Sequence, residues 1–177
     1  TEPIRALVLT DSSATTAEQR NQQNYVDALY SVGVDARSID LSSFFEVPSD
    51  INLLIIPYSA GSSLSEQQSL FVLHALQQGL NVILERHTPL SGSIGVEPGA
   101  ETKQIQRVVD EYYPQVGIHW KQPDSLRAFD IDIDYVTYYS EPEDEWPVMV
   151  GGEYGDGKYI FLGTVFDSYT PSGYGRY

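Results

Sequence analysis

Apolar and polar residues alternate along the first half of the chain, in short apolar runs separated by longer segments with helical periodicity. The apolar runs predict strands at residues 4–9, 34–41, 51–58 and 81–85. The third run is apolar almost throughout, as in a central parallel strand covered on both faces. Strands that alternate with helices favour an α/β fold, with a mainly parallel sheet between two layers of helices.

Capping signals set the expected starts of the first two helices. Thr15 and Glu18 have the spacing of a capping box, and Gly33 stands where a left-handed C-cap is favoured. A Ser/Gly loop is expected after the third strand, followed by a second capping box at Ser63 and Glu66. That box would begin the helix that precedes the fourth strand.

The second half of the chain carries a different pattern. A third helix is predicted over residues 102–112, because Ile105 and Val108 begin a series of apolar residues at helical spacing. Residues 116–166 then alternate in short segments, which predicts an antiparallel extension of the sheet. Glycines within residues 154–158 predict a hairpin turn between two of these strands.

No repeat, low-complexity tract or linker divides the sequence, so residues 1–177 are predicted to form a single α/β domain. Residues 167–177 are aromatic and rich in Gly and Pro, which favours a tail that leads into a further domain. The chain begins at Thr1 rather than Met, as expected of a sequence from which an upstream leader or domain has been removed.

Charge and cysteine content narrow the range of functions. Lys and Arg number 10 against 25 Asp and Glu, a net charge of −15. Such a surface repels phosphate backbones, so no nucleic-acid partner is expected. No apolar run reaches the roughly 18 residues of a membrane-spanning helix. Without cysteine, the chain can form neither disulfides nor thiolate metal sites and has no Cys nucleophile.

Polar residues gather where the predicted parallel strands end. The fourth strand opens directly onto Glu85, Arg86 and His87. Open α/β sheets bind ligands in the crevice outside the carboxyl ends of their strands. The candidate binding cluster is therefore expected at this end of the sheet, where the following residues should converge: Asp11, Ser12, Tyr58, Ser59, Glu85, Arg86 and His87.

A hydrolase or transferase is the alternative function for this cluster. Ser59 or Ser62 would act as the nucleophile, with His87 as the base and Glu85 as the acid. The loop YSAGSS contains no G-x-S-x-G elbow, so loop and capping roles are favoured for these serines.

No metal or cofactor is expected. Asp130, Asp132 and Asp134 share one face of a predicted strand, and residues 141–146 form an acidic loop. A charged edge strand and a solvated loop are the favoured interpretations, and cation binding at either stays open. A flavin held by the hydroxyls that follow the first strand is a weaker alternative, because no glycine-rich cradle is present.

Three segments carry a resemblance to a known superfamily: RALVLTDSS, INLLIIPYSAGSSLSEQQSLFVLHALQQGLNVILE and YGDGKYIFLGTVFD. The chain resembles the class I glutamine amidotransferase-like (flavodoxin-like) superfamily, in the non-catalytic form of β-galactosidase trimerisation domains and of domains attached to bacterial polysaccharide deacetylases and glycosidases. The resemblance covers most of the chain and implies a three-layer flavodoxin-like sandwich.

The resemblance also implies where catalytic residues would lie, and they are missing. The family's Cys nucleophile would fall at about Arg86, on a tight turn where Glu85 and His87 are too bulky for close backbone approach. The later His-x-Glu pair has no counterpart, since Trp120 follows His119. We expect a Glu85–Arg86 ion pair and a packed His87 in place of an amidotransferase centre.

The function implied is that of a non-catalytic accessory domain in a larger, exported protein that acts on polysaccharides. Its partners would be other domains of the same polypeptide and a polysaccharide. Exposed aromatic rings would supply glycan contact, and the candidates are Trp120, Trp146, Tyr169 and Tyr174. The sequence leaves the oligomeric state and the substrate open.

Overall fold

The computed structural model describes residues 3–110, 117–131, 136–139 and 147–165. Its elements in chain order are β1 (Arg5–Thr10), α1 (Thr16–Ser31), β2 (Asp35–Asp40), the 3-10 helix η1 (Leu41–Ser43), β3 (Leu53–Ile56), α2 (Tyr58–Ser63), α3 (Glu66–Gln77), β4 (Asn81–Glu85), α4 (Pro89–Ser93), β5 (Val96–Asp110), β6 (Gly117–Ile131), β7 (Val136–Tyr139), β8 (Pro147–Tyr154) and β9 (Gly157–Leu162).

All the described strands join one nine-stranded sheet in the order β2-β1-β3-β4-β9-β8-β7-β5-β6. The pairs from β2 to β9 are parallel, and the pairs from β9 to β6 are antiparallel. This confirms the predicted α/β class, a parallel core with an antiparallel extension. The sequence did not predict that β9 returns to lie beside β4.

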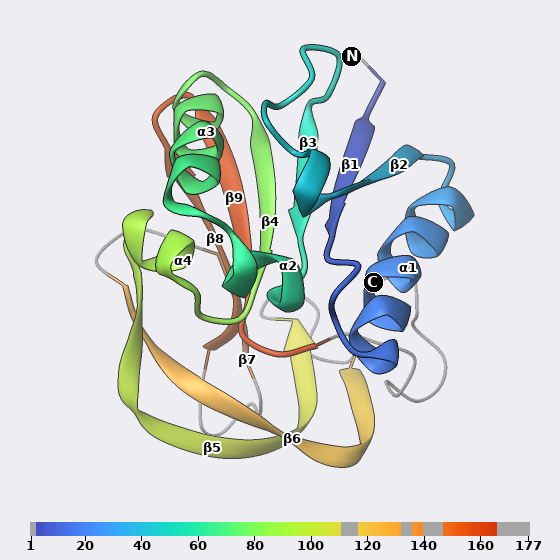
Figure 1. The fold of residues 1–177 in the computed structure, drawn as a ribbon. Helices are drawn as coiled ribbons and strands as arrows, with labels where there is room; N and C mark the ends of the chain where they lie inside the picture. Colours follow the sequence, from blue (N-terminus) through green and yellow to red (C-terminus); the bar gives the residue numbers. More distant parts are fainter. Residues whose placement is uncertain (1–2, 111–116, 132–135, 140–146, 166–177) are drawn as a thin grey trace.

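Helices lie on both faces of the parallel strands, which gives three layers (Figure 1). Alternation along the strands divides the core accordingly. On one face, Val8 and Ile55 pack with Val26 of α1. On the other face, a larger cluster joins Leu54 and neighbouring strand residues to α3 through Leu76. The wide apolar runs of β1, β3 and β4 follow from this burial on two sides.

The four predicted parallel strands and the first helix are confirmed. Thr15 caps α1 and forms the capping box with Glu18, and Gly33 follows the helix with a φ of +81°. The second capping box was misplaced. Ser65 and Gln68 form it, because the segment predicted as a Ser/Gly loop is the short helix α2.

The helix predicted over residues 102–112 is wrong, since most of this segment belongs to β5. Ile105 and Val108 are both buried, although they lie three positions apart. The register with β6 is irregular between Ile105 and Arg107, and this breaks the alternation of a regular strand. The resulting spacing has the period of a helix, which is why the pattern misled.

The predicted hairpin is confirmed between β8 and β9, with Gly155 at a φ of +63° in its turn. Long strands β5 and β6 form a two-stranded arm that crosses beneath the carboxyl ends of the parallel strands (Figure 1). The arm therefore lies over the end of the sheet where α/β proteins place their ligands. Among the described residues, no helix is long and apolar enough to cross a membrane.

Candidate functional site

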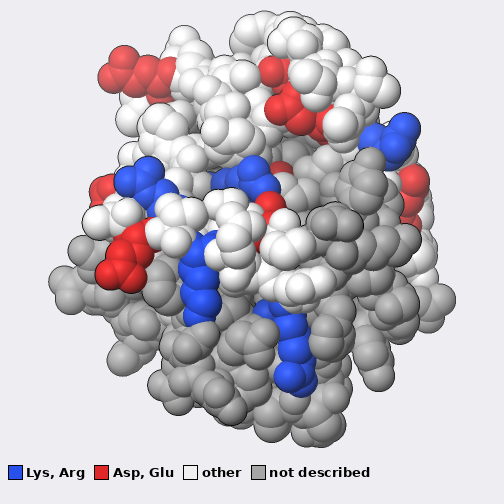
Figure 2. Space-filling model, turned by 90° about the horizontal axis from the view of Figure 1, so that it is seen from below, with Lys and Arg blue, Asp and Glu red and all other residues white. Residues whose placement is uncertain are grey.

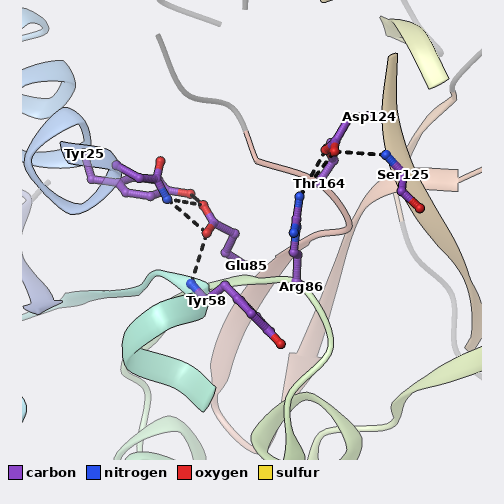
Figure 3. Close-up of polar contacts among 8 residues, drawn as sticks. Tyr25, Tyr58, Glu85, Arg86, Asp124, Ser125 and Thr164 are labelled. Atoms are coloured by element: carbon purple, nitrogen blue, oxygen red, sulfur yellow. Dashed lines mark hydrogen bonds and ion pairs between the residues drawn. The ribbon is translucent and has the colours of Figure 1, made fainter. Parts of the chain in front are cut away.

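Glu85 is the last residue of β4, and its carboxylate is buried, with 2 % of the residue exposed. Its carboxylate accepts hydrogen bonds from Asn21 Nδ2, at 3.1 and 3.2 Å to its two oxygens, and from the Tyr25 hydroxyl. The backbone N–H of Tyr58 donates a further bond at 3.0 Å (Figure 3). The carboxylate thus joins α1 to β4 and to the first residue of α2.

The expected ion pair between Glu85 and Arg86 is wrong. Arg86 has a φ of +57° and is the only described non-glycine residue with a positive φ. This sharp turn directs its guanidinium away from Glu85, toward Asp124 of β6 at 3.2 Å (Figure 3). Asp124 also accepts from the Thr164 hydroxyl and from the backbone N–H of Ser125. Two consecutive residues therefore bind opposite parts of the molecule.

The resemblance places the family's nucleophile on a tight turn at about Arg86, and the positive φ of Arg86 shows that a tight turn is present there. Residues in sparsely populated backbone regions gather at active sites and ligand clamps. Here the turn carries a guanidinium, whose central carbon Cζ lies 5.9 Å from the ring centre of Tyr58. The backbone therefore has the geometry of a nucleophile turn, but the side chain on it is an arginine that forms an ion pair with Asp124.

His87 packs against aromatic rings, as expected. Its ring centre lies 4.8 Å from that of Phe161 and 5.4 Å from that of Phe129. Burial and the neighbouring Arg127 charge lower the pKa of His87, while backbone groups of Arg127 and Val96 oppose the shift. Neither ring nitrogen makes a hydrogen bond of good geometry to a described residue. The imidazole is therefore held neutral at pH 7.

The serines of α2 bond to other groups. Ser59 is buried and accepts a 2.7 Å hydrogen bond from Gln22 Nε2 of α1. The hydroxyl of Ser62 donates to the backbone oxygen of Ser59 at 3.2 Å. Within the part of the chain that the structure describes, no hydrogen bond joins either serine to His87. The Ser–His pair of the hydrolase alternative is not assembled there.

Asp11 and Ser12 form a separate network at the ends of β1 and β2. Asp11 accepts from the backbone N–H and the hydroxyl of Ser13, which lowers the pKa of its carboxyl group. The backbone N–H of Ser12 donates to Asp40 at 2.7 Å. The hydroxyl of Ser42 and nearby N–H groups lower the pKa of Asp40 to about 2. These carboxylates stabilise loops, and the network is distinct from that of Glu85.

A cavity of about 640 Å³ that is open to solvent lies on the surface between α4 and the arm. Its lining residues are His87, Thr88, Pro89, Gly92, Ser93, Glu97, Pro98 and Arg127. Only His87 of this set was predicted from the sequence. Glu97 and Arg127 come from the arm, and their presence at one cavity depends on the antiparallel register of β5 with β6, which the sequence pattern did not reveal.

The remaining sequence candidates fall outside what the structure describes. Trp146, Tyr169 and Tyr174 lie beyond the described residues, as do Asp132, Asp134 and the acidic segment 141–146. The side chains of Trp120 and Asp130 are also outside the description. No group of three or more His, Cys, Asp or Glu residues among the described ones could hold a metal ion.

No model of a known protein family matches this sequence, and no curated protein matches it. Solved structures do match. Gan42B, a GH42 β-galactosidase from G. stearothermophilus, superposes with a TM-score of 0.67 and 15 % identity over 92 % of this chain. The β-galactosidase of the Antarctic haloarchaeon Halorubrum lacusprofundi gives a TM-score of 0.68 and 13 % identity over 99 % of the chain.

A cytoplasmic protein of Salmonella typhimurium matches with a TM-score of 0.60 and 10 % identity, over 94 % of this chain and 90 % of its own. By contrast, the chain spans 27 % of Gan42B and 29 % of the haloarchaeal enzyme. At these identities the matches establish the fold. The chain is similar in fold to one part of GH42 β-galactosidases, in agreement with the superfamily resemblance found in the sequence.

Proposed function

We propose that this chain is a non-catalytic accessory domain of a larger, exported protein that acts on polysaccharides, where it serves assembly and glycan contact. The observation that supports this most is the turn after β4. The position that the resemblance assigns to a nucleophile holds Arg86, and its guanidinium is paired with Asp124 of the arm.

Two further observations support the proposal. Glu85 and Ser59, which an enzyme would leave available to substrate, are buried and hydrogen-bonded to α1. Fold neighbours of this chain include β-galactosidases and an exo-β-1,4-mannosidase, of whose lengths it covers 27 to 32 %. A domain of this relative size fits a supporting role beside a separate catalytic domain.

The test compares the parent protein with variants of this domain. Ser59→Ala and Ser62→Ala would each remove a candidate nucleophile of the hydrolase alternative, and each should leave kcat/KM of the parent on chromogenic glycosides within about twofold. The chain alone should show no turnover. A loss of a hundredfold or more in either variant would instead support the hydrolase. Cell fractionation tests export, with recovery outside the cytoplasm as the expected result.

A further inference from the structure

The cavity between α4 and the arm contains charges that the rest of the protein does not use. The Glu97 carboxylate has no hydrogen bond or ion pair with another described residue. Arg127 donates from Nε to the backbone oxygen of Gly99 at 2.8 Å. This bond leaves both terminal amino groups of the guanidinium without a partner in the described part of the chain, and no ion pair joins Glu97 to Arg127.

The wall beside these charges is shaped for close approach. A Cβ atom built on Gly92 would lie 3.1 Å from an oxygen of Glu97, so the carboxylate lies directly over the backbone of α4. Ser93 donates its hydroxyl hydrogen to the backbone oxygen of Pro89 at 3.1 Å, which leaves the Oγ lone pairs of Ser93 free to accept. The cavity therefore presents acceptors and donors close to one another.

Apolar surfaces complete the cavity. The rings of Pro89 and Pro98 line it, and the imidazole of His87 lies at its wall in the neutral form. The cavity has a volume of about 640 Å³ and is open to solvent, so a ligand would lie against its wall with one side exposed.

This combination selects among ligand classes. Glu97 would repel a phosphate, and the net charge of −15 adds to that repulsion. Acidic and basic side chains are interspersed on the face seen from below (Figure 2). A neutral ligand with many hydroxyl groups suits a mixed surface of this kind, because each hydroxyl can donate to a carboxylate and accept from a guanidinium.

We infer that this cavity binds a neutral saccharide of one or two rings. Sugar hydroxyls would donate to Glu97 and accept from the terminal amino groups of Arg127. The C–H face of a sugar ring would lie against Pro89 and Pro98. A small zwitterion could meet both charges, but it has no ring face to cover the prolines. The inference deepens the proposed function, since it places glycan contact at a named site and rests on that function only for the choice of sugars.

The test is calorimetric titration of the full chain with β-1,4-linked galactobiose and mannobiose, with glycine and inorganic phosphate as competing ligand classes. One of the two disaccharides should bind with a millimolar or lower Kd. Glu97→Gln and Arg127→Gln should each weaken binding at least tenfold, and Gly92→Leu should abolish it by filling the cavity. Matched exposed variants outside the cavity, Glu153→Gln and Arg37→Gln, should bind as the wild type does.

Several outcomes would overturn the inference. These are no saccharide binding by the wild type, equal affinity in the cavity variants and in the matched controls, or binding of glycine or phosphate in place of the sugars. Circular dichroism and thermal unfolding of each variant show whether a loss of binding reflects a loss of folding, and Glu97→Gln, at an exposed position, is expected to fold normally. The proposed function fails separately, through turnover by the chain or loss of parent activity in the Ser59→Ala or Ser62→Ala variant, both of which lie outside the cavity lining.

Discussion

The parallel half of the molecule and the β5–β6 arm differ in strand length, in burial and in the regularity of strand pairing. In the parallel half, the short strands β1, β3 and β4 are buried on both faces and connect to helices that pack beside them, so local sequence and final environment agree. The arm consists of two 15-residue strands with register shifts, and part of its apolar surface forms a small separate cluster with Val148 of β8. Element type can therefore be predicted from sequence where burial is uniform, and such prediction fails where strand pairing is irregular.

The two regions meet at consecutive residues. Glu85 binds the helices of the parallel half, and Arg86 binds the arm (Figure 3). We therefore expect substitutions at contacts of the parallel half to cost much stability, and substitutions at contacts of the arm to cost less because its side chains can shift. Four predictions test this difference, in order of decreasing effect.

Two buried glycines of the β9 segment provide the largest contrast. A Cβ on Gly157 would lie 2.2 Å from the backbone oxygen of Leu76 and 2.3 Å from that of Leu80, at the end of α3. Gly157→Ala should therefore lower the free energy of unfolding by about 4 kcal/mol, because backbone cannot easily move aside. A Cβ on Gly163 meets the tips of the Phe129 and Leu126 side chains, at 2.5 and 2.6 Å.

Because these arm side chains can shift, Gly163→Ala should lower the free energy of unfolding by only about 1.5 kcal/mol. Urea unfolding followed by circular dichroism measures both variants. Equal losses would mean that the arm is packed as rigidly as the helical layer.

Glu85→Ala should lower the free energy of unfolding by about 3 kcal/mol, because Asn21, Tyr25 and the Tyr58 N–H lose a shared charged acceptor. Glu85→Gln keeps one oxygen acceptor and should lower it by about half as much. Glu97→Gln, at an exposed carboxylate, is the matched control and should change it by less than about 0.5 kcal/mol. A loss in Glu85→Ala no larger than in the control would contradict a structural role for this carboxylate.

Arg86 tests how strongly the arm is held. Arg86→Ala removes the pair with Asp124 and keeps the unfavourable positive φ, so unfolding should become easier by about 1 kcal/mol. Arg86→Gly also removes the pair, but glycine adopts this φ without strain. We expect Arg86→Gly to be more stable than Arg86→Ala by about 1 kcal/mol, and thus close to the wild type. Thermal unfolding compares them, and the reverse order would show that the turn is unstrained.

The smallest effect concerns pH. The folded state lowers the pKa of His87 from its ordinary value of 6.5, so the unfolded chain binds the proton first. Stability should therefore fall as pH drops below 6.5 toward the lowered value, by less than about 1.4 kcal/mol per pKa unit of difference. Denaturant midpoints between about pH 7 and pH 5 measure the slope.

His87→Gln should flatten that slope. The lowered carboxyl pKa values of Asp11 and Asp40 also reduce stability as pH falls, but in a lower range, around and below the ordinary value of 3.8, so they do not contribute to the slope between about pH 7 and pH 5. An unchanged slope in His87→Gln would mean that the imidazole is hydrated in the folded state.

Much of the parallel half could be predicted because its signals are local. Thr15 and Gly33 mark the ends of α1 by capping chemistry, and residues 81–85 match β4 to the residue. The candidate cluster was predicted in part. Ser59 and Glu85 both bond to α1, and the Tyr58 N–H bonds to Glu85, because their position at carboxyl strand ends follows from topology.

The partners within the site could not be predicted in the same way. Arg86 was expected to bind its neighbour Glu85, and it binds Asp124, which is 38 positions away. That choice depends on one backbone angle and on the register of β6, and neither leaves a periodic trace in the sequence. Glu97 and Arg127 were missed for the same reason, since only the fold of the arm brings them to one cavity.

The position of β9 has a consequence for how the molecule is made. The last described strand lies in the interior of the sheet, between β4 and β8, and pairs with both. During synthesis, the hydrogen-bonding edge of β4 therefore has no partner until residue 162 has left the ribosome. The parallel half must wait as an incomplete sheet with an open apolar edge, a state that is prone to association with other chains. Completion of this sheet depends on contacts between distant parts of the sequence, and such contacts slow folding.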